Sequence, residues 1–599
     1  MSSLEKNIIN KLNSAASEED LFQVTEIASN LLSQGSIEEP FFLYVCAVVR
    51  FRTGDANLAF TLLTHALDLA PNDAKIYVAK SVMIGSLRDK TAKNIIADFA
   101  KRVIKSIGRF KKPAVTIDEI FRGLGFTEAE DPVWKDFVFE RFSLPLLQHL
   151  INERMYDMAL IVEELVFLNY LRSGGTDYEA RFTKSTRKWY PSMERLGKAL
   201  AIEKNLKIND KLRLHNNKIA FFIHSESMLA HVGTVFSILE SYKQRGGRGF
   251  EAAIISFSGC NQEMRQKFES YNVQVISLQE LFPASTIHQR YLYLKEFLVE
   301  QEIEILIWVC LTVHMSFAFG LRIAPIQIWY TSSYYRGLIN KEIDKRVLTT
   351  VLADGVFEGG NRWDILNFSI TSLCKNEADI RYEIASLKKS LMGDKFHNII
   401  GVLAREQKLQ DKSYIEAIAQ VLKRNPDTLF VWTGTRHDET VQRHIRDFDI
   451  ADQSKYIGWI DTSIYVHVLD VFMDTFPFPC GLTLYQAMAA GKASVSLRTD
   501  DAMSMGIHGQ LSSVFDPSGD FEFVEERAAR IRQIFGDDGH LFLLMSTVDE
   551  YVEAACLLIS NRNQRTAVGD ANRYLAEEFL LDPLKMSQSF DRIVGSYLR

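Results

Sequence analysis

The stretch FPFPCGLTLYQAMAAGKASVSL (Phe476–Leu497) predicts a loop, a helix and a strand in succession. Prolines and aromatic residues open it, small helix-forming residues follow Gly481, and a strand-like run follows Gly491. Free backbone N–H groups at the start of such a helix, next to Cys480, Gly481 and Thr483, favour an anion such as a diphosphate. The alternative is an ordinary connection, because the stretch lacks the residue spacing of a P-loop.

Similar pairs of a predicted strand and a predicted helix precede this stretch. Strand-like runs alternate with amphipathic helical patterns, first at 218–223, 250–259, 273–278 and 303–309, and then at 399–404, 428–434, 455–460, 471–475 and 493–497. Such alternation predicts parallel sheets covered by helices, and ligands of these sheets bind beyond the carboxyl ends of the strands. We therefore expect two doubly wound α/β domains that face a cleft, with a terminal helix packed across them.

The region before these units is predicted to be helical, since its apolar residues recur at three- and four-residue spacing. Residues 53–84 resemble one helix-turn-helix repeat of the tetratricopeptide type. No second copy follows at the expected period, so a generic helical bundle is the preferred interpretation. The predicted domains are residues 1–210, all helical; 211–390, the first α/β domain; and 391–599, the second α/β domain with C-terminal helices.

Bulk composition limits the classes of function. Hydrophobic residues make up 47% and charged residues 24%, as in ordinary globular proteins, and the net charge of −7 argues against a nucleic-acid partner. The 6 cysteines have no metal-binding or disulfide spacing, which suits a reducing compartment. The N-terminus lacks a signal-peptide core, and no apolar run is long enough for a membrane span. We expect a cytoplasmic protein.

Two side chains stand where a predicted strand gives way to a helix. His224 occupies such a position, and the alternative to a ligand role is that this turn simply caps the next helix. Lys408 follows a strand of the second block, where a lysine can neutralise phosphate as a mobile point charge, and Arg405 is a second candidate in the same loop. On charge alone, a solvated lysine is the simpler interpretation.

Metal and hydrolase motifs find no support in the sequence. Asp447 and Asp449 lie in a charged helical run, and Asp500, Asp501 and His508 share a loop without metal-ligand spacing. Neither GxSxG nor HExxH occurs.

Five segments resemble, in order, the relatives of O-GlcNAc transferase, and in particular the bacterial cytoplasmic N-glycosyltransferases that modify adhesins. HSESM (224–228) resembles their HSxSM turn, and GLRIAPIQIWYTSS (320–333) their RxAPIQ segment. QKLQDKSYIEAI (407–418) is similar to the segment with their phosphate-binding lysine. MDTFPFPCGLTLYQAMAAG (473–491) is similar to their nucleotide-sugar loop, and STVDEYVEAACLLISNRNQR (546–565) to their C-terminal helix.

The resemblance runs from Lys218 to the C-terminus and implies a GT-B fold after an all-helical domain, a UDP-sugar donor and no catalytic metal. His224 matches an active-site histidine, and Lys408 matches the lysine that contacts the donor diphosphate. The implied UDP-sugar-binding residues are Lys408, Arg405, Thr435, Cys480, Gly481, Leu482, Thr483 and Gln486. The implied acceptor-side residues are His224, Gln327, Ser332 and Ser333.

Two positions depart from the family pattern. Gln486 stands where the family has an acid that can hold the ribose, and an amide is a weaker, neutral acceptor. The residues TSSY (Thr331–Tyr334) replace the family's LG[H/Y]P segment on the acceptor side.

Together these features predict an enzyme, a UDP-sugar-dependent protein glycosyltransferase. It is expected to transfer a hexose (glucose, galactose or GlcNAc), with inversion, to Asn or Ser/Thr side chains of a protein or peptide, such as an adhesin or another surface protein. We expect no cofactor, no metal and no nucleic-acid partner. The alternatives are a non-catalytic acceptor-binding subunit and a GT-B enzyme that acts on a glycan. The oligomeric state stays open.

Overall fold

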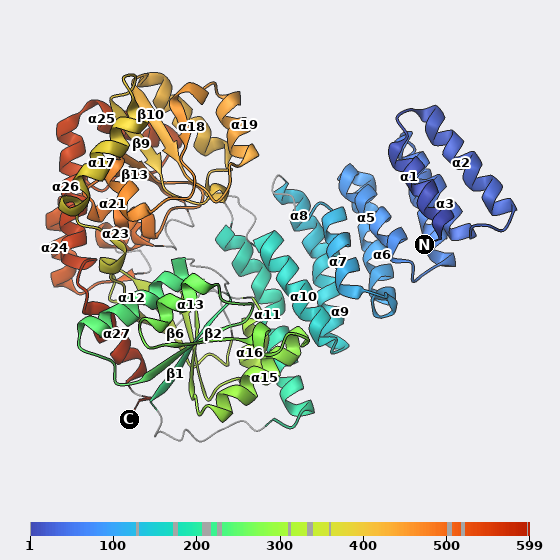
Figure 1. Cartoon of the computed structure of the whole chain (residues 1–599), viewed down its shortest axis with the longest axis horizontal. Helices are drawn as coiled ribbons and strands as arrows, with labels where there is room; N and C mark the ends of the chain where they lie inside the picture. The colour runs from blue at the N-terminus through green and yellow to red at the C-terminus, as the bar shows by residue number, and fades with distance from the viewer. Residues whose placement is uncertain are drawn as a thin grey trace. The chain divides into compact units, whose positions relative to one another are not determined.

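The computed structural model of the chain (Figure 1) describes residues 2–126, 131–171, 178–206, 217–224, 230–309, 313–331, 340–358, 361–499, 506–516, 521–595 and 597–598. The chain divides into two compact units, residues 1–173 and 174–599. Every helix in the described ranges is too short or too polar to cross a bilayer.

The first unit is helical. Its α-helices are α1 (Ser3–Ser14), α2 (Glu18–Ser33), α3 (Glu39–Arg52), α4 (Ala56–Leu69), α5 (Ala74–Leu87), α6 (Lys90–Ser106), α7 (Pro113–Gly123), α8 (Pro132–Val138), α9 (Leu144–Asn152) and α10 (Tyr156–Val166). Asp55 and Asp73 cap α4 and α5, the helix pair inside the tetratricopeptide-like residues 53–84. Helix α3 packs against α4, and α5 packs against α7. The prediction of a helical N-terminal region is confirmed.

The second unit begins with α11 (Tyr178–Glu203) and then forms a first sheet with the strand order β14-β7-β8-β6-β5-β4-β1-β2-β3. The strands are β1 (Lys218–Ile223), β2 (Glu251–Ser256), β3 (Gln274–Ser277), β4 (Ile305–Val309), β5 (Ile326–Thr331), β6 (Lys345–Thr350), β7 (Gly355–Glu358), β8 (Asn361–Asn367) and β14 (Phe521–Glu522). All pairs are parallel except β7 with β8 and β14 with β7. Every residue of β4 and β5 is buried, so both faces of the sheet are covered.

Helices alternate with the strands of this sheet. They are α12 (Ala230–Gln244), α13 (Gln262–Glu269), α14 (Leu278–Leu281), α15 (Ile287–Glu300) and α16 (Met315–Gly320), and α17 (Glu377–Met392) leads into the second sheet. The region from β1 to α17 is called the first lobe below.

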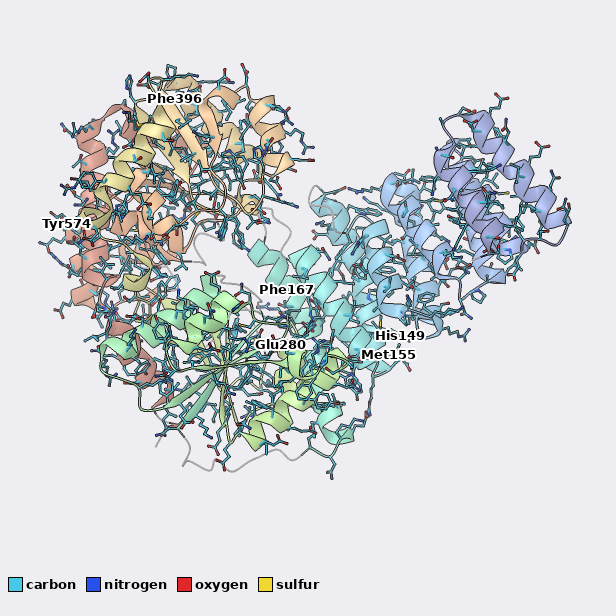
Figure 2. All side chains as sticks on the ribbon, in the orientation of Figure 1. His149, Met155, Phe167, Glu280, Phe396 and Tyr574 are labelled. Carbon is cyan, nitrogen blue, oxygen red and sulfur yellow. The ribbon has the colours of Figure 1, made fainter. Side chains whose placement is uncertain are left out.

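The second lobe contains a parallel sheet with the order β11-β10-β9-β12-β13-β15. The strands are β9 (Asn398–Val402), β10 (Thr428–Trp432), β11 (Ser454–Tyr456), β12 (Val471–Met473), β13 (Ala493–Leu497) and β15 (Leu544–Met545). Its helices are α18 (Lys412–Arg424), α19 (Glu439–Asp447), α20 (Thr462–Tyr465), α21 (Leu482–Ala489), α23 (Ile507–Phe515), α24 (Glu525–Phe535), α25 (Val548–Ser560) and α26 (Arg562–Phe579). Helical periodicity explains the packing of α26: Tyr574 points away from the protein (Figure 2), whereas the next residue, Leu575, is buried.

In both sheets the first strand of the lobe lies in the interior, with the next two strands on one side and the fourth on the other. This order is that of doubly wound domains, in which the chain reverses direction next to the first strand. The predicted fold class, a helical region followed by two such α/β domains as in GT-B proteins, is confirmed.

Three later elements connect the second lobe to the first. Strand β14 extends the first sheet, and α27 (Lys585–Val594) packs against β8 and α12, as predicted for a terminal helix. Ser589 Oγ accepts a hydrogen bond from Asn367 N and donates one to Ile365 O, each 3.0 Å long. The third element is α23, where buried Gln510 uses Oε1 to accept hydrogen bonds from the backbone N–H groups of residues 351–353 at 2.9–3.3 Å.

Backbone contact between α11 and α16 depends on two glycines. A Cβ atom on Gly197 would lie 2.1 Å from the carbonyl oxygen of Phe317, and a Cβ atom on Gly320 would lie 2.1 Å from that of Glu194. Only glycine permits this approach, which sets the position of α11 against the first lobe.

We predict that Gly320→Ala destabilises the protein, because the added methyl group overlaps a backbone carbonyl that a side-chain rotation cannot move. The cost should be about 1–3 kcal/mol, which lowers Tm by several degrees in thermal unfolding followed by circular dichroism. Gly108→Ala is the control, since no described atom would lie within 4 Å of a Cβ atom added at Gly108. Equal Tm values for the two variants would contradict the close packing.

A second prediction concerns the junction of the lobes. Gln510→Leu leaves three adjacent backbone N–H groups without their acceptor. Each unsatisfied buried group costs about 1–3 kcal/mol, so Tm should fall clearly. Gln510→Glu keeps the acceptor and should lose less stability than Gln510→Leu, but its second oxygen meets the carbonyl oxygen of Gly506, to which Nε2 of Gln510 donates at 3.0 Å. Gln533→Ala on the exposed face of α24 is the control and should change Tm little. An unchanged Tm in Gln510→Leu would show that water replaces the amide.

Candidate functional site

The site in the second lobe lies at the carboxyl edge of its sheet, between β9 and β12. These strands are neighbours, but the chain visits β10 and β11 on one side before it returns to β12 on the other. The loops that follow β9 and β12 therefore diverge at the point where doubly wound domains bind ligands. Lys408 is in the first loop, and residues 474–481 form the second. The second loop is called the diphosphate loop below, after the ligand that the sequence analysis predicts for it.

Lys408 contacts the diphosphate loop directly. It ends a 3-10 turn (Glu406–Lys408), and its Nζ atom donates a hydrogen bond to the carbonyl oxygen of Pro479. The ammonium group also lies over the ring of Phe478, 5.1 Å from the centroid. The side chain is half-buried, so it is oriented by the loop rather than extended into solvent. The structure thus brings together two features that are far apart in the sequence.

The diphosphate loop is organised by the buried side chain of Asp474. Its Oδ1 atom accepts hydrogen bonds from the backbone N–H groups of Thr475 at 3.0 Å and Cys480 at 2.7 Å. Thr475 Oγ1 in turn donates to Phe478 O at 2.6 Å, and Thr499 Oγ1 donates to Pro477 O at 3.0 Å. These contacts define the path of the loop into α21.

The first turn of α21 offers backbone donors. Gly481 is the N-cap residue and supplies no side-chain cap, and its carbonyl accepts from the N–H groups of Leu484 and Tyr485. The N–H groups of Leu482 and Thr483 precede the first hydrogen bond of the helix, so they have no acceptor within it. Gly481 is exposed, and Leu482 and Thr483 are half-buried. This geometry suits an anion.

Cys480 is a structural member of the loop. Burial, and then the neighbouring Asp474 carboxylate, raise the pKa of its thiol to about 11. The side chain is therefore a neutral thiol near pH 7, and its chemistry is not that of a nucleophile. Its contribution to the site is the backbone N–H that it donates to Asp474.

Gln486 points toward the connection between the lobes. Its side chain is buried, and Nε2 donates a hydrogen bond of 2.6 Å to the carbonyl oxygen of Leu373. Leu373 belongs to a 3-10 turn (Thr371–Leu373) between β8 and α17. The amide therefore has a partner in the protein itself at the position where the family pattern has an acid.

Arg405 and Thr435 are both exposed near Lys408 in the loops after β9 and β10. Thr435 donates to the buried carboxylate of Glu406 through both its backbone N–H and its Oγ1 atom, each at 2.8 Å. Burial disfavours the charged form of Glu406, but these hydrogen bonds hold its pKa below the usual range. Glu406, which sequence reasoning missed, therefore joins the two loops.

His224 lies at the corresponding edge of the first sheet, directly after β1 and next to β4, where that sheet has its own reversal. Its ring stacks on Phe257, with the centroids 4.7 Å apart, and its carbonyl oxygen accepts a hydrogen bond from Ser258 Oγ at 3.1 Å. The prediction that His224 ends a strand at the carboxyl edge agrees with this position.

His314 is a second histidine at this edge that sequence reasoning did not identify. Its ring centroid lies 5.8 Å from that of His224, and its Nδ1 atom is 3.3 Å from the hydroxyl of Tyr291. The residue is fully buried and has a left-handed backbone with φ of 59°, which is uncommon outside glycine. Its place after the apolar run of β4 was the available sequence signal.

Gln327 is not brought together with the other candidates. It is the second residue of β5, and so it lies at the amino end of a parallel strand, opposite the edge that carries His224. Its side chain is fully used: Oε1 accepts from Ile323 N, and Nε2 donates to Phe319 O and Glu342 O, at 3.0–3.1 Å. Ser332 and Ser333 lie outside the described residues.

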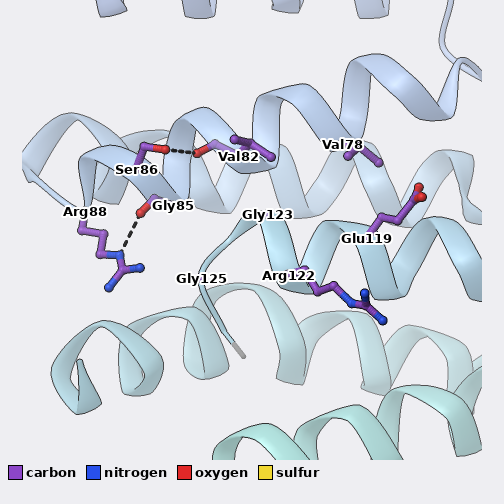
Figure 3. A pocket seen from close by; sticks show the side chains of 9 residues that line it. All are labelled: Val78, Val82, Gly85, Ser86, Arg88, Glu119, Arg122, Gly123 and Gly125. Carbon is purple, nitrogen blue, oxygen red and sulfur yellow. Dashed lines mark hydrogen bonds between the residues drawn. The ribbon is translucent and has the colours of Figure 1, made fainter. Parts of the chain in front are cut away.

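Metal-ligand clusters and surface grooves are two other features that can mark a functional site. Among the described residues, no group of three or more His, Cys, Asp and Glu side chains could hold a metal ion. A groove of about 690 Å³ is lined by residues of α5 and α7 in the first unit, among them Val78 and Val82 (Figure 3). The two helices approach closely at Gly85, where an added Cβ atom would lie 2.1 Å from the carbonyl oxygen of Gly123. None of the predicted site residues lines this groove.

Comparison with known proteins adds one family match. Residues 399–537, which include Lys408 and the diphosphate loop, match the model of a family described as "Glycosyl transferases group 1". No curated protein matches the sequence.

Several solved structures are similar to this chain. An O-GlcNAc transferase mutant from Thermobaculum terrenum has 14% identity over 100% of this chain and 99% of that chain, with a TM-score of 0.48. A glycosyltransferase from Rickettsia africae has 11% identity over 64% and 99%, with a TM-score of 0.46. The pneumococcal O-GlcNAc transferase GtfA, in complex with UDP and GlcNAc, has 11% identity over 64% and 100%, with a TM-score of 0.42. The family match and the two α/β domains support a glycosyltransferase.

Proposed function

We propose that the chain is a protein glycosyltransferase that uses a UDP-sugar as donor. The observation that carries the proposal is the contact of Lys408 with the diphosphate loop at the reversal point of the second sheet. An ammonium group and the first N–H groups of a helix both suit a diphosphate. The match to "Glycosyl transferases group 1" covers both features and supports the same assignment.

The proposed reaction is an inverting transfer of a hexose such as glucose, galactose or GlcNAc. A lone pair of the acceptor, an Asn or Ser/Thr side chain, attacks the anomeric carbon while the bond from that carbon to the diphosphate oxygen breaks on the opposite face. The bonding pair leaves with UDP, and the acceptor proton passes to a base. Negative charge thus develops on UDP, where donors fixed in advance give the largest stabilisation.

Lys408 and the first turn of α21 supply these donors in the proposed mechanism. On donor binding, Lys408 exchanges the carbonyl oxygen of Pro479 for a phosphate oxygen, which is a stronger partner because it carries a charge. The N–H groups of Leu482 and Thr483 meet the same diphosphate. The Asp474 contacts keep the loop in place during this exchange.

His224 is proposed to serve the acceptor, either as the base that accepts its proton or as the group that positions it. The stacking on Phe257 and the proximity of His314 fix the plane of its imidazole ring. A ring held in one orientation loses little conformational entropy when the acceptor binds.

A second candidate function is a non-catalytic subunit that binds the acceptor. The contact of Gln486 with Leu373 favours it, because this amide is committed to a carbonyl oxygen and leaves the ribose without an acid at that position. A GT-B enzyme that acts on a glycan is the third candidate. Titration calorimetry with UDP, and intact-mass detection of candidate proteins co-expressed with the chain, separate these functions.

Lys408→Ala should slow UDP release from the preferred UDP-sugar by about 10²–10³-fold in kcat, the usual effect of removing one donor that faces developing charge. A screen of UDP-glucose, UDP-galactose and UDP-GlcNAc identifies that donor beforehand. Lys412→Ala is the matched control, since Lys412 is exposed and its ammonium group lies over the ring of Phe448. Full turnover in Lys408→Ala would remove the lysine from the mechanism.

His224→Ala should abolish most transfer to the acceptor while UDP binding, measured by calorimetry, stays close to that of the unmodified chain. The reason is that His224 and Lys408 belong to different lobes, so the donor contacts persist. We expect a loss of about 10²–10⁴-fold in transfer, the range of general acid–base catalysis. Loss of UDP affinity in this variant would instead place His224 in the donor site.

A further inference from the structure

Beneath the diphosphate loop, Asp474 continues into a chain of buried hydrogen bonds through Ser496 and His508, two residues that the proposed mechanism does not use. Asp474 Oδ2 accepts a hydrogen bond of 3.0 Å from Ser496 Oγ on β13. His508 Nε2, in the first turn of α23, lies 2.7 Å from the same Ser496 Oγ and 3.1 Å from Asp474 Oδ2. The exposed fractions of Asp474, Ser496 and His508 are 1%, 4% and 1%, so water does not compete for these contacts.

The direction of each hydrogen bond between Asp474, Ser496 and His508 follows from which groups can donate. A carboxylate only accepts, and Ser496 donates its single proton to Asp474. The Ser496 oxygen must then accept from His508, so Nε2 of His508 carries a proton. The same N–H faces Asp474 Oδ2, which places a positive hydrogen beside the negative carboxylate.

The other ring nitrogen of His508 is consistent with this tautomer. Among the described residues, no hydrogen-bond partner lies at Nδ1. His508 lines a cavity of about 10 Å³, enough for about one water molecule, together with the polar residues Ser494, Ser496 and Asn572. An unprotonated Nδ1 can accept from such a water, whereas a second N–H would add a buried donor that needs a partner.

Asp474 connects Ser496 and His508 to the diphosphate loop through its two carboxylate oxygens. Its other oxygen, Oδ1, accepts from the N–H of Cys480, the residue before the N-cap of α21. If Oδ2 lost its partners, the carboxylate could rotate, and the Cys480 contact would loosen. The hydrogen-bond partner of Lys408 would move as well, because Lys408 binds the carbonyl oxygen of Pro479, the residue before Cys480.

We propose that His508 is a positioning residue: through Ser496 and Asp474 it holds the diphosphate loop in the conformation that receives the donor. The inference rests on the proposed function for the identity of the ligand, but not for the position of the loop. His508 does not touch the donor; it acts through the two intermediate side chains.

The test compares two substitutions at one position. His508→Gln keeps an N–H near the place of Nε2, whereas His508→Met fills a similar volume without a donor. His444→Met is the control, because His444 on α19 is also buried in the second lobe and has no contact with the diphosphate loop among those described. Circular dichroism and Tm define conditions in which all variants are folded. If His508→Met does not fold, Ser496→Ala takes its place.

The first readout does not require any ligand. Cys480 is buried in the loop, so its alkylation by iodoacetamide, followed by peptide mass mapping, reports how often the loop opens. We expect alkylation to be about tenfold faster in His508→Met than in the unmodified chain, which corresponds to the loss of one buried hydrogen bond, and nearly unchanged in His508→Gln and His444→Met.

The second readout is the dissociation constant for UDP. It should rise about tenfold in His508→Met and less than about threefold in His508→Gln. If UDP does not bind the unmodified chain, the proposed function fails, and Cys480 alkylation still decides the positioning role. Equal alkylation rates in His508→Met and the unmodified chain, or equal acceleration in His444→Met, would overturn the inference.

Discussion

The buried carboxylate of Asp474 is the interaction on which the rest of the second lobe's site depends. A charge removed from water is tolerated only when hydrogen bonds replace its hydration. Asp474 obtains them from its own loop and from Ser496 on β13, while its backbone carbonyl accepts from Tyr551 on α25 at 2.9 Å. A strand, a helix and a loop thus donate to the same residue, three of the contacts to its carboxylate and one to its carbonyl oxygen, and this residue ties the loop to the elements around it.

The same topological rule places a candidate residue in each lobe. In each sheet the first strand is interior, and the loop after it carries a functional candidate: His224 after β1 and Lys408 after β9. Parallel pairing brings all carboxyl ends to one edge, so residues separated by whole helices in the sequence meet there. Strain is found at this edge too, in the left-handed backbone of His314.

The parts that could be predicted from the sequence are those with local signals. Alternating strands and helices follow from periodicity, and Lys408, His224 and the start of α21 follow from their places at strand ends. The pairings of Asp474 with Ser496 and of Glu406 with Thr435 could not be predicted, because they join separate strand ends and leave no local pattern. Gln327 is different: its place at the start of a strand already indicates the amino edge, and the family resemblance alone suggested the acceptor side.

The departure at Gln486 also has a physical explanation in the fold. An acid at this position would bring a carboxylate oxygen to the carbonyl oxygen of Leu373, two acceptors without a proton between them, whereas the amide donates there at 2.6 Å. The turn that contains Leu373 is itself tied to the C-terminal segment, since Thr371 Oγ1 donates to Leu581 O at 2.8 Å. Gln486 therefore couples α21 to the turn between β8 and α17 that connects the lobes. This structural contact accounts for an amide at position 486 without reference to the donor.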